Sequence, residues 1–245
     1  MKDTNSSLDT WPDVALKTAF DLMRPLSSAN RVIIDVGAHR GETLWSISNN
    51  NEHNTRYFGL EPDPGTFEAL KEAREKIELL NLEVSLFNVA AGPSDGKIRF
   101  SKAKESAVSG ILKPVDGLLE RVPTGDHIIV DELEVEQITI DSLAKSQNLR
   151  EVHLLKVDAE GYDLEVLRGA ESLLKNQDVA IVIAEVFFVP YREGQAYFWE
   201  IANYLHQLKY RFVNLYDTRN TQQGRLYTGN GIWVSAEVAV LNNFL

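Results

Sequence analysis

The sequence predicts a single α/β domain built on a doubly wound, mostly parallel sheet with helices on both faces. Short apolar runs rich in β-branched residues alternate along the chain with segments in which apolar residues recur at helical spacing. Because consecutive parallel strands must be joined by a crossover connection, usually a helix, this alternation indicates repeated βαβ units. The 245 residues fit one large domain of this kind, and no linker or internal repeat interrupts the pattern.

The first third of the chain is predicted to contain two strand–helix pairs after an N-terminal extension. Residues 1–30 are expected to form a helical extension, because residues 11–26 are amphipathic and the pattern ends at Pro25. The domain then occupies residues 31–245. Its first elements are a strand at 32–36, a helix at 43–48, a strand at 57–60 and a helix whose apolar positions run from Phe67 to Leu80.

The middle of the chain is predicted to carry a β-hairpin insertion. Residues 82–90 form a third strand, and residues 97–101 alternate like its hairpin partner after a turn rich in Gly, Pro and Asp. Residues 102–126 show no period and are expected to be irregular. Residues 127–138 are expected to form a strand pair or one long strand at a half-exposed edge, since glutamates alternate with apolar residues there.

The last third of the chain repeats the strand–helix order. A strand at 152–158, a helix with apolar positions from Leu164 to Leu174 and a very apolar strand at 179–189 follow one another. Continuous apolar runs of this length are typical of strands buried on both faces. A helix with apolar positions from Phe198 to Leu208 comes next, and a closing pair of strands is predicted at 210–216 and 231–235.

The composition limits the partners of the protein. The chain has 25 basic and 36 acidic residues, and its net charge of −11 argues against nucleic acid or an anionic membrane as the main partner. It has no cysteine, which excludes disulfides and thiolate metal sites. The polar N-terminus and the lack of a long apolar run predict no signal peptide, no membrane insertion and a cytoplasmic location.

A glycine-containing loop follows the first predicted strand, where doubly wound sheets bind their ligands. In this loop Asp35, Gly37 and Gly41 precede a helix, so the backbone can turn tightly and offer free N–H groups to a ligand. The dinucleotide fingerprint requires glycine where His39 stands, and its last glycine comes five residues after its first, whereas Gly41 follows Gly37 by four. The fit to NAD is therefore poor, and a nucleoside cofactor without a pyrophosphate, such as S-adenosylmethionine, is favoured.

Two further strand ends carry candidate cofactor contacts. Glu61 ends the second strand 20 residues beyond Gly41, where an acid accepts the hydrogen bonds of a ribose diol. Asn88 and Ala90 follow the third strand and are candidates for contacts to an adenine ring. The simpler alternatives are a solvated loop acid at Glu61 and a plain strand end at Asn88.

The strongest local cluster of charges lies at 156–163, after the fourth strand. Burying charges of this kind costs roughly several kcal/mol each unless they are paired or used, which favours a functional role for Asp158 and Glu160. Asp163 is expected to cap the next helix. Glu185 lies inside an otherwise apolar strand and requires a partner or a function for the same reason.

The ordered set of these motifs resembles the FkbM family of S-adenosylmethionine-dependent methyltransferases. The resemblance extends over residues 32–233, and its matching segments are 35–41, 61–62, 88–92, 138–143 and 154–170, with Glu185 beyond them. It implies a class I methyltransferase fold, which is Rossmann-like and has a seven-stranded sheet that is parallel except for the last-inserted strand. It also implies transfer of a methyl group to a hydroxyl, commonly on a sugar or a polyketide-like metabolite.

The resemblance also implies roles for individual residues. The methionine part of the cofactor is expected to bind at Asp35, Gly37 and Gly41, and its ribose at Glu61. From their position after the first and third strands, His39, Asn88 and Ala90 are further candidates for cofactor contacts. Asp158 faces the reacting centre and is the expected general base, with Glu160 as the second candidate. Together with Glu185, these two acids form a possible Mg²⁺ site, and the metal would lower the pKa of the acceptor hydroxyl.

Acceptor selection is expected to come from residues 102–126 and 187–197. Tyr191 and Tyr197 are candidates for stacking on a sugar face, whereas Trp199, on a helix, is expected to pack in the core. The acceptor is expected to be a small molecule or carbohydrate, and the oligomeric state is left open.

Two other functions stay open at this point. An NAD(P)-dependent oxidoreductase would also use Gly37, Gly41 and Glu61, and a methyltransferase-like domain that binds ligand without turnover would retain the same strand-end residues. Thermal stabilisation by S-adenosylmethionine or S-adenosylhomocysteine, but not by NAD(H), would exclude the oxidoreductase.

Overall fold

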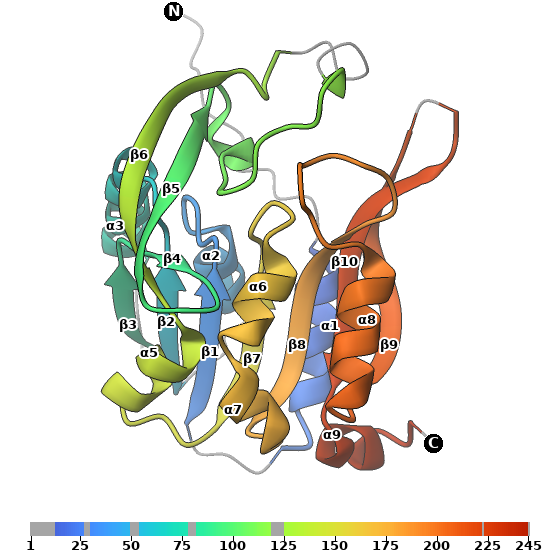
Figure 1. Ribbon diagram of the computed structural model, residues 1–245. Coiled ribbons are helices and arrows are strands. Elements are labelled where there is room, and N and C mark those ends of the chain that lie inside the picture. Colours follow the sequence, from blue (N-terminus) through green and yellow to red (C-terminus); the bar gives the residue numbers. More distant parts are fainter. Residues whose placement is uncertain are drawn as a thin grey trace, which may run out of the picture.

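The computed structural model describes residues 13–26, 30–49, 54–77, 82–118, 125–221 and 223–244. Its main element is a seven-stranded sheet with helices on both faces, and a second, three-stranded sheet reaches over the ends of several of its strands (Figure 1). In spatial order the main sheet contains β3 (Leu82–Phe87), β2 (Thr55–Leu60), β1 (Arg31–Val36), β7 (Val152–Val157), β8 (Val179–Phe187), β10 (Leu226–Val234) and β9 (Arg211–Asn220).

This strand order confirms the predicted fold class. Strands β3, β2, β1, β7 and β8 are parallel, and β10 is antiparallel to both of its neighbours, β8 and β9. The chain runs outward from β1 to β3 and then returns to place β7 on the other side of β1. The strand order therefore reverses between β1 and β7, and a crevice at the carboxyl ends of these strands is the expected ligand site.

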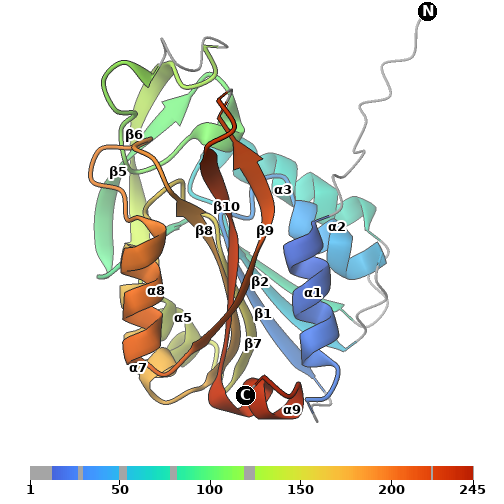
Figure 2. The ribbon, with the colours of Figure 1, turned by 90° about the vertical axis from the view of Figure 1, so that its right-hand side faces the viewer.

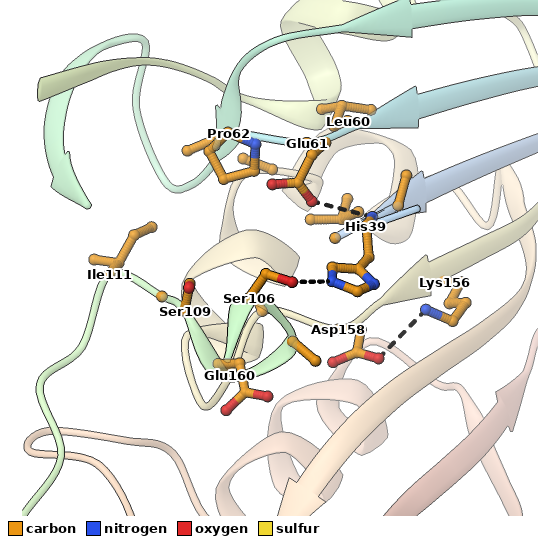
Figure 3. Close-up of a pocket in the computed structure, with 18 of the residues that line it drawn as sticks. His39, Leu60, Glu61, Pro62, Ser106, Ser109, Ile111, Lys156, Asp158 and Glu160 are labelled. Atoms are coloured by element: carbon orange, nitrogen blue, oxygen red, sulfur yellow. Dashed lines mark hydrogen bonds and ion pairs between the residues drawn. The ribbon is translucent and has the colours of Figure 1, made fainter. Parts of the chain in front are cut away.

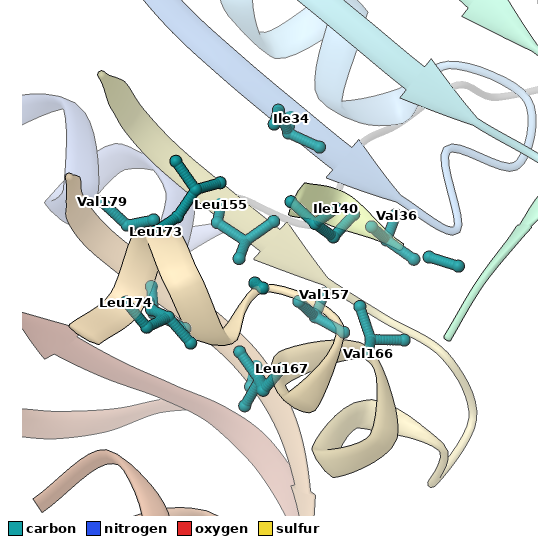
Figure 4. Close-up of a cluster of buried hydrophobic side chains, with 14 of the residues drawn as sticks. Ile34, Val36, Ile140, Leu155, Val157, Val166, Leu167, Leu173, Leu174 and Val179 are labelled. Atoms are coloured by element: carbon teal, nitrogen blue, oxygen red, sulfur yellow. The ribbon is translucent and has the colours of Figure 1, made fainter. Parts of the chain in front are cut away.

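Helices cover the two faces of the sheet in separate groups (Figure 2). One face carries α5 (Ile140–Ser146), α6 (Asp163–Arg168), α7 (Glu171–Lys175) and α8 (Phe198–Gln207), and the other carries α1 (Val14–Met23), α2 (Glu42–Asn49), α3 (Pro64–Lys76) and α9 (Ala236–Leu241). On the first face, strand and helix side chains interdigitate in one buried cluster (Figure 4). Each fully buried Leu, Ile or Val stabilises the fold by about 1.5–3 kcal/mol.

The N-terminal helix α1 packs on the sheet against β8, β9 and β10. It begins after Asp13, whose side chain accepts a hydrogen bond from the Leu16 N–H, and its last residue is Met23. The helix stops short of Pro25, because proline has no N–H to donate to the carbonyl four residues earlier. Trp11 lies outside the described residues.

The predicted pairing of the insertion was wrong. Strand β3 ends at Phe87, β4 (Ala90–Ala91) belongs to the second sheet, and β5 (Gly96–Ala103) pairs with β6 (Ile129–Ile138) rather than with β3. Gly92 packs so closely on Gln137 of β6 that a Cβ would lie 2.3 Å from the glutamine side chain, and its N–H donates to the Ile138 carbonyl at 3.0 Å, so this part of the chain is attached to the second sheet. Local alternation identified the strand, but its partner lies about 35 residues further along the chain.

Two more expectations for this region can be compared with the structure. Residues 129–138 form one strand rather than a strand pair, and most of this strand is paired only with β5. In its described residues, the segment after β5 is irregular as predicted and contains the short 3₁₀ helix η1 (Ser106–Val108). Residues 119–124 of this segment, like Leu80 in the first half of the chain, lie outside the described residues.

Candidate active site

A cavity of about 380 Å³ lies at the carboxyl ends of β1, β2 and β7, beneath the insertion (Figure 3). The loops after four strands and the segment around η1 contribute to its wall. The predicted site residues that line it are Gly37, His39, Glu61, Ala90, Asp158 and Glu160. The sheet topology therefore brings together residues that lie more than 120 positions apart in the sequence.

Gly37 joins the ends of three strands. Its N–H and that of Ala38 both donate to the Leu60 carbonyl at 3.0 Å, which fastens the loop after β1 to the end of β2. Its φ of +74° is a left-handed conformation, and a Cβ there would lie 2.0 Å from the carbonyl oxygen of Asp158. Glycine is required because the loop after β7 packs directly against it.

Asp35 and Gly41 do not line the cavity; each supports it from behind. Asp35 is buried, accepts a hydrogen bond from the Tyr57 hydroxyl at 2.7 Å and pairs with Lys156 Nζ at 3.3 Å. Gly41 has a φ of +93°, and a Cβ there would lie 3.2 Å from Leu70 of α3. This glycine therefore serves the close packing of the loop on α3.

Glu61 presents a buried carboxylate to the cavity. Its Oε2 accepts from the His39 N–H at 3.0 Å and its Oε1 from the Asp63 N–H at 2.9 Å, so the side chain is held in one orientation. Burial raises the pKa of Glu61 to about 7. A carboxylate has about four acceptor positions, so two stay available for a diol.

Asn88 supports Glu61 rather than lining the cavity. Its side-chain amide donates to the Glu61 carbonyl at 2.8 Å and to the Pro62 carbonyl at 3.1 Å, which holds the end of β2 beside the end of β3. Ala90 lines the cavity as predicted, and with Val89 and Ala91 it forms an apolar wall.

His39 connects the loop after β1 to the insertion. Its Nε2 lies 2.9 Å from Ser106 Oγ and its Nδ1 3.0 Å from Glu42 Oε1 (Figure 3 shows the first contact). Burial opposes the charged imidazole, but the hydrogen bond and charge of Glu42 outweigh burial and raise the pKa of His39. Ser106 was not recognised in the sequence, because nothing in an irregular segment indicates which loop it will meet.

Lys156 and Asp158 lie at the tip of β7. Lys156 Nζ is 3.3 Å from Asp35 and 3.5 Å from Asp158 Oδ2, so one ammonium bridges a buried and an accessible carboxylate. Burial lowers the pKa of Lys156, and the two carboxylates raise it by more, so it stays charged. The Asp158 side chain is 43% exposed and faces the cavity, which makes it accessible to a bound acceptor.

Glu160 and Glu185 complete an acidic group with Asp158. One carboxylate oxygen of each lies within 4.8 Å of the others. Glu160 Oε2 accepts from Arg192 Nη2 at 2.7 Å, and Glu185 Oε1 lies 3.2 Å from the Thr228 hydroxyl. Burial raises the pKa of both glutamates. Carboxylate oxygens suit Mg²⁺, but each of the three acids already has a protein partner: Lys156 for Asp158, Arg192 for Glu160 and Thr228 for Glu185.

Asp163 is not the helix cap that the sequence predicted. It is the first residue of α6, and its buried carboxylate accepts from the Gly161 N–H at 3.2 Å and the Glu185 N–H at 3.1 Å. Its function is to join the loop after β7 to β8. An aspartate that caps a helix and one that accepts a hydrogen bond from a neighbouring strand can stand in the same local sequence. Only the fold shows which of the two roles Asp163 has.

The aromatic residues proposed for acceptor selection do not line the cavity. Tyr191 is buried and stacks on Phe187, with ring centroids 5.1 Å apart. Trp199 is 54% exposed and stacks on Tyr197, so its expected core position was wrong. The cavity is lined on the side of the insertion by Phe100 and, from the predicted segment 102–126, by Ser109, Gly110 and Ile111.

None of the helices within the described ranges is both long and apolar enough to span a bilayer.

Comparison with known proteins identifies the family. Residues 35–212 match the methyltransferase FkbM domain. The chain is 27% identical over 160 residues to hexuronic acid methyltransferase AglP of Haloferax volcanii, an alignment that covers 61% of this chain and 57% of that protein.

Solved structures with a similar fold include magnesium protoporphyrin IX methyltransferase (ChlM) of Synechocystis PCC 6803 with bound SAM. The TM-score is 0.49 and the sequence identity 10%, and the alignment covers 91% of this chain and 79% of that chain. Another is M. capricolum TrmK with S-adenosylhomocysteine, with a TM-score of 0.45 at 10% identity over 91% and 68%. The family match spans more than half of the chain and decides against the oxidoreductase alternative. The chain therefore belongs to the FkbM family of S-adenosylmethionine-dependent methyltransferases.

Proposed function

We propose that this protein transfers a methyl group from S-adenosylmethionine to a hydroxyl of a small-molecule or carbohydrate acceptor. One observation carries the proposal: Glu61, suited to a ribose, and Asp158, an accessible carboxylate, line the same cavity from opposite sides of β1. A cofactor held at Glu61 therefore extends toward Asp158.

The cofactor half of the cavity comprises the loop after β1, Glu61 and the apolar wall around Ala90. Glu61 accepts the ribose hydroxyls, Ala90 and its neighbours cover the adenine, and the loop at Gly37 allows the methionine part to approach the backbone closely. His39 closes this half from above, since it reaches Ser106 of the insertion.

Asp158 is the proposed general base. When bound, the cofactor would supply an electrophilic methyl group, which an acceptor oxygen would attack in line while the sulfur leaves as the thioether of S-adenosylhomocysteine. An alcohol is a weak nucleophile at neutral pH, so Asp158 accepts its proton as the new bond forms. Lys156, which pairs with both Asp158 and Asp35, holds the carboxylate in place. Glu160 is the second candidate for the base.

The acceptor is proposed to be a sugar or a related polyhydroxylated small molecule. The net charge of −11 and the acidic group at the cavity disfavour nucleic acid. A relative named as a hexuronic acid methyltransferase supports the inclusion of uronic acids among the acceptors tested.

The proposal is tested with the purified chain, isotopically labelled S-adenosylmethionine and a panel of methyl glycosides, uronic acids and phenolics. Asp158→Asn should abolish transfer but leave S-adenosylhomocysteine affinity nearly unchanged. Asp131→Asn, a change of the same chemistry at an exposed position on β6, should behave like wild type. Normal turnover by Asp158→Asn would show that the base is misassigned.

The same experiment separates the non-catalytic alternative. Binding of S-adenosylhomocysteine without transfer to any acceptor would favour a domain that binds ligand only. Failure of the wild-type chain to bind S-adenosylhomocysteine would overturn the proposal as a whole.

A further inference from the structure

The part of the insertion that covers the cavity is held from several sides. We call residues 106–111 the roof. Gly110 and Ser101 of β5 exchange two backbone hydrogen bonds of 2.8 and 3.0 Å, and Ser106 contacts His39 over the cofactor half. On the acceptor side, the Val108 carbonyl accepts a hydrogen bond of 2.6 Å from Arg192 Nη2. Side chains from both halves of the main sheet therefore hold the roof.

Arg192 joins the roof to the acidic group through a single nitrogen. It lies in the connection between β8 and α8, and its side chain is completely buried. Nη2 donates to Val108 and also to Glu160 Oε2 at 2.7 Å. The guanidinium lies 4.8 Å from the centroid of the Tyr191 ring, which is itself packed among other aromatic side chains. The side chain therefore has little freedom to move.

This contact is costly for the fold. Arg192 Nε and Nη1 are buried and have no hydrogen-bond partner among the described residues, although a buried donor without a partner is unfavourable. Glu160 has a φ of +52°, a left-handed conformation that is unfavourable for a residue with a side chain. Two unfavourable features meet in one ion pair at the cavity, which is typical of a functional site rather than of a stability device.

The roof also rests directly on Glu160. A Cβ at Gly110 would lie 3.1 Å from Glu160 Cβ, so the roof backbone and the glutamate are already in close contact. A displacement of the roof toward Glu160 therefore has to move the Glu160 side chain, which Arg192 holds in place.

We propose that Arg192 is a positioning residue for methyl transfer: it fixes the roof and the Glu160 carboxylate as one unit and so sets the shape of the acceptor side of the cavity. This inference rests on the proposed function. It implies that loss of Arg192 impairs acceptor use while cofactor affinity is retained, because Glu61 is held by the N–H groups of His39 and Asp63 and not through Arg192.

The simpler role for Arg192 is neutralisation of Glu160, and a double-mutant cycle separates the two roles. If Arg192 only balances the charge, Glu160→Gln should rescue Arg192→Met. If Arg192 also anchors Val108, the double variant should stay as impaired as Arg192→Met. Arg192→Lys keeps a cation with several donors but a shorter reach, and it should recover part of the function. Arg168→Met removes an exposed partner of Glu165 on α6, where it does not line the cavity, and serves as the matched control.

The experiment measures hydrogen exchange of residues 106–111, affinity for S-adenosylhomocysteine, and kcat and KM with the best acceptor of the panel. We expect Arg192→Met to raise the hydrogen-exchange rate of the roof amides about tenfold. It should lower kcat/KM for the acceptor by about 100-fold, the loss that a displacement of roughly 1 Å causes. S-adenosylhomocysteine affinity should stay within about twofold of wild type, since one removed roof contact leaves those of Glu61 intact. Arg192→Lys provides the same readouts if Arg192→Met does not fold.

Unchanged roof exchange in Arg192→Met, or full rescue by Glu160→Gln, would overturn the inference. Unchanged acceptor kinetics would also overturn it while leaving the proposed function intact. If the wild-type chain neither binds S-adenosylhomocysteine nor transfers methyl groups, the proposed function fails, and the exchange measurement still reports whether Arg192 anchors the roof.

Discussion

The substitution Gly37→Ala tests whether the loops after β1 and β7 must touch for the site to form. Gly37 has a φ of +74°, and the added methyl group would lie 2.0 Å from the Asp158 carbonyl oxygen. An ordinary contact begins at 3.4 Å, so the two groups must separate by about 1.4 Å. Neither moves freely, because the Asp158 N–H donates to the Val36 carbonyl at 3.1 Å in the centre of the sheet.

The expected cost has two parts. A left-handed conformation costs alanine about 1–2 kcal/mol, and the forced separation in a packed interior costs about 1–3 kcal/mol. Gly37→Ala should therefore lower the free energy of unfolding by about 2–5 kcal/mol. Because the separation displaces Asp158 by roughly 1 Å, methyl transfer should also fall by about 100-fold.

Gly224→Ala is the matched control. Gly224 has a nearly identical φ of +77°, and apart from its chain neighbours no atom of the described residues lies within 4 Å of an added Cβ. It should incur only the conformational cost of about 1–2 kcal/mol and retain full activity. Urea denaturation and labelled-methyl transfer measure both variants. Equal stability of the two variants, with wild-type transfer by Gly37→Ala, would refute the assigned packing.

Three further outcomes follow from the site. Burial raises the pKa of Glu61 from 4.5 to about 7. If the ionised form binds the ribose, the affinity for S-adenosylhomocysteine, measured by calorimetry, should rise about tenfold from pH 6 to 8. The same measurement on Glu61→Gln should show no such rise. Between pH 4.5 and about 7, Glu61 holds a proton in the native state that it has lost in the unfolded state. The contribution of Glu61 to the free energy of unfolding therefore falls as the pH increases through this range. Lys156→Met should lower the free energy of unfolding by about 3–5 kcal/mol, because it leaves Asp35 buried without its cation. Adding Asp35→Asn should recover much of that loss in urea denaturation. No recovery in the double variant would contradict the pairing of Lys156 with Asp35. Because Glu160 and Glu185 already have protein partners, EDTA should leave methyl transfer unchanged, and a loss reversed by Mg²⁺ would show that the acidic group binds a metal.

Much of the site could be predicted because its residues follow strands. A strand buried on both faces is visible as a short apolar run, and in a parallel sheet such runs end at a common edge. Gly37, Glu61 and Asp158 could therefore be assigned to one site before their contacts were known. Asn88 was assigned to the correct strand end but to the wrong neighbour, because the direction of its side chain depends on the Glu61 and Pro62 carbonyls beside it.

The amino-acid sequence alone determined the fold class, the family and the strand ends that line the cavity, since these depend on local periodicity and short motifs. Only the tertiary structure decided that β5 pairs with β6, that Gly41 packs on α3, and that Arg192 connects the roof to Glu160. The physical reason is the same in each case. Such contacts join segments that are distant in the chain, and each is selected by packing and by the hydrogen-bond needs of buried groups, which no local pattern encodes.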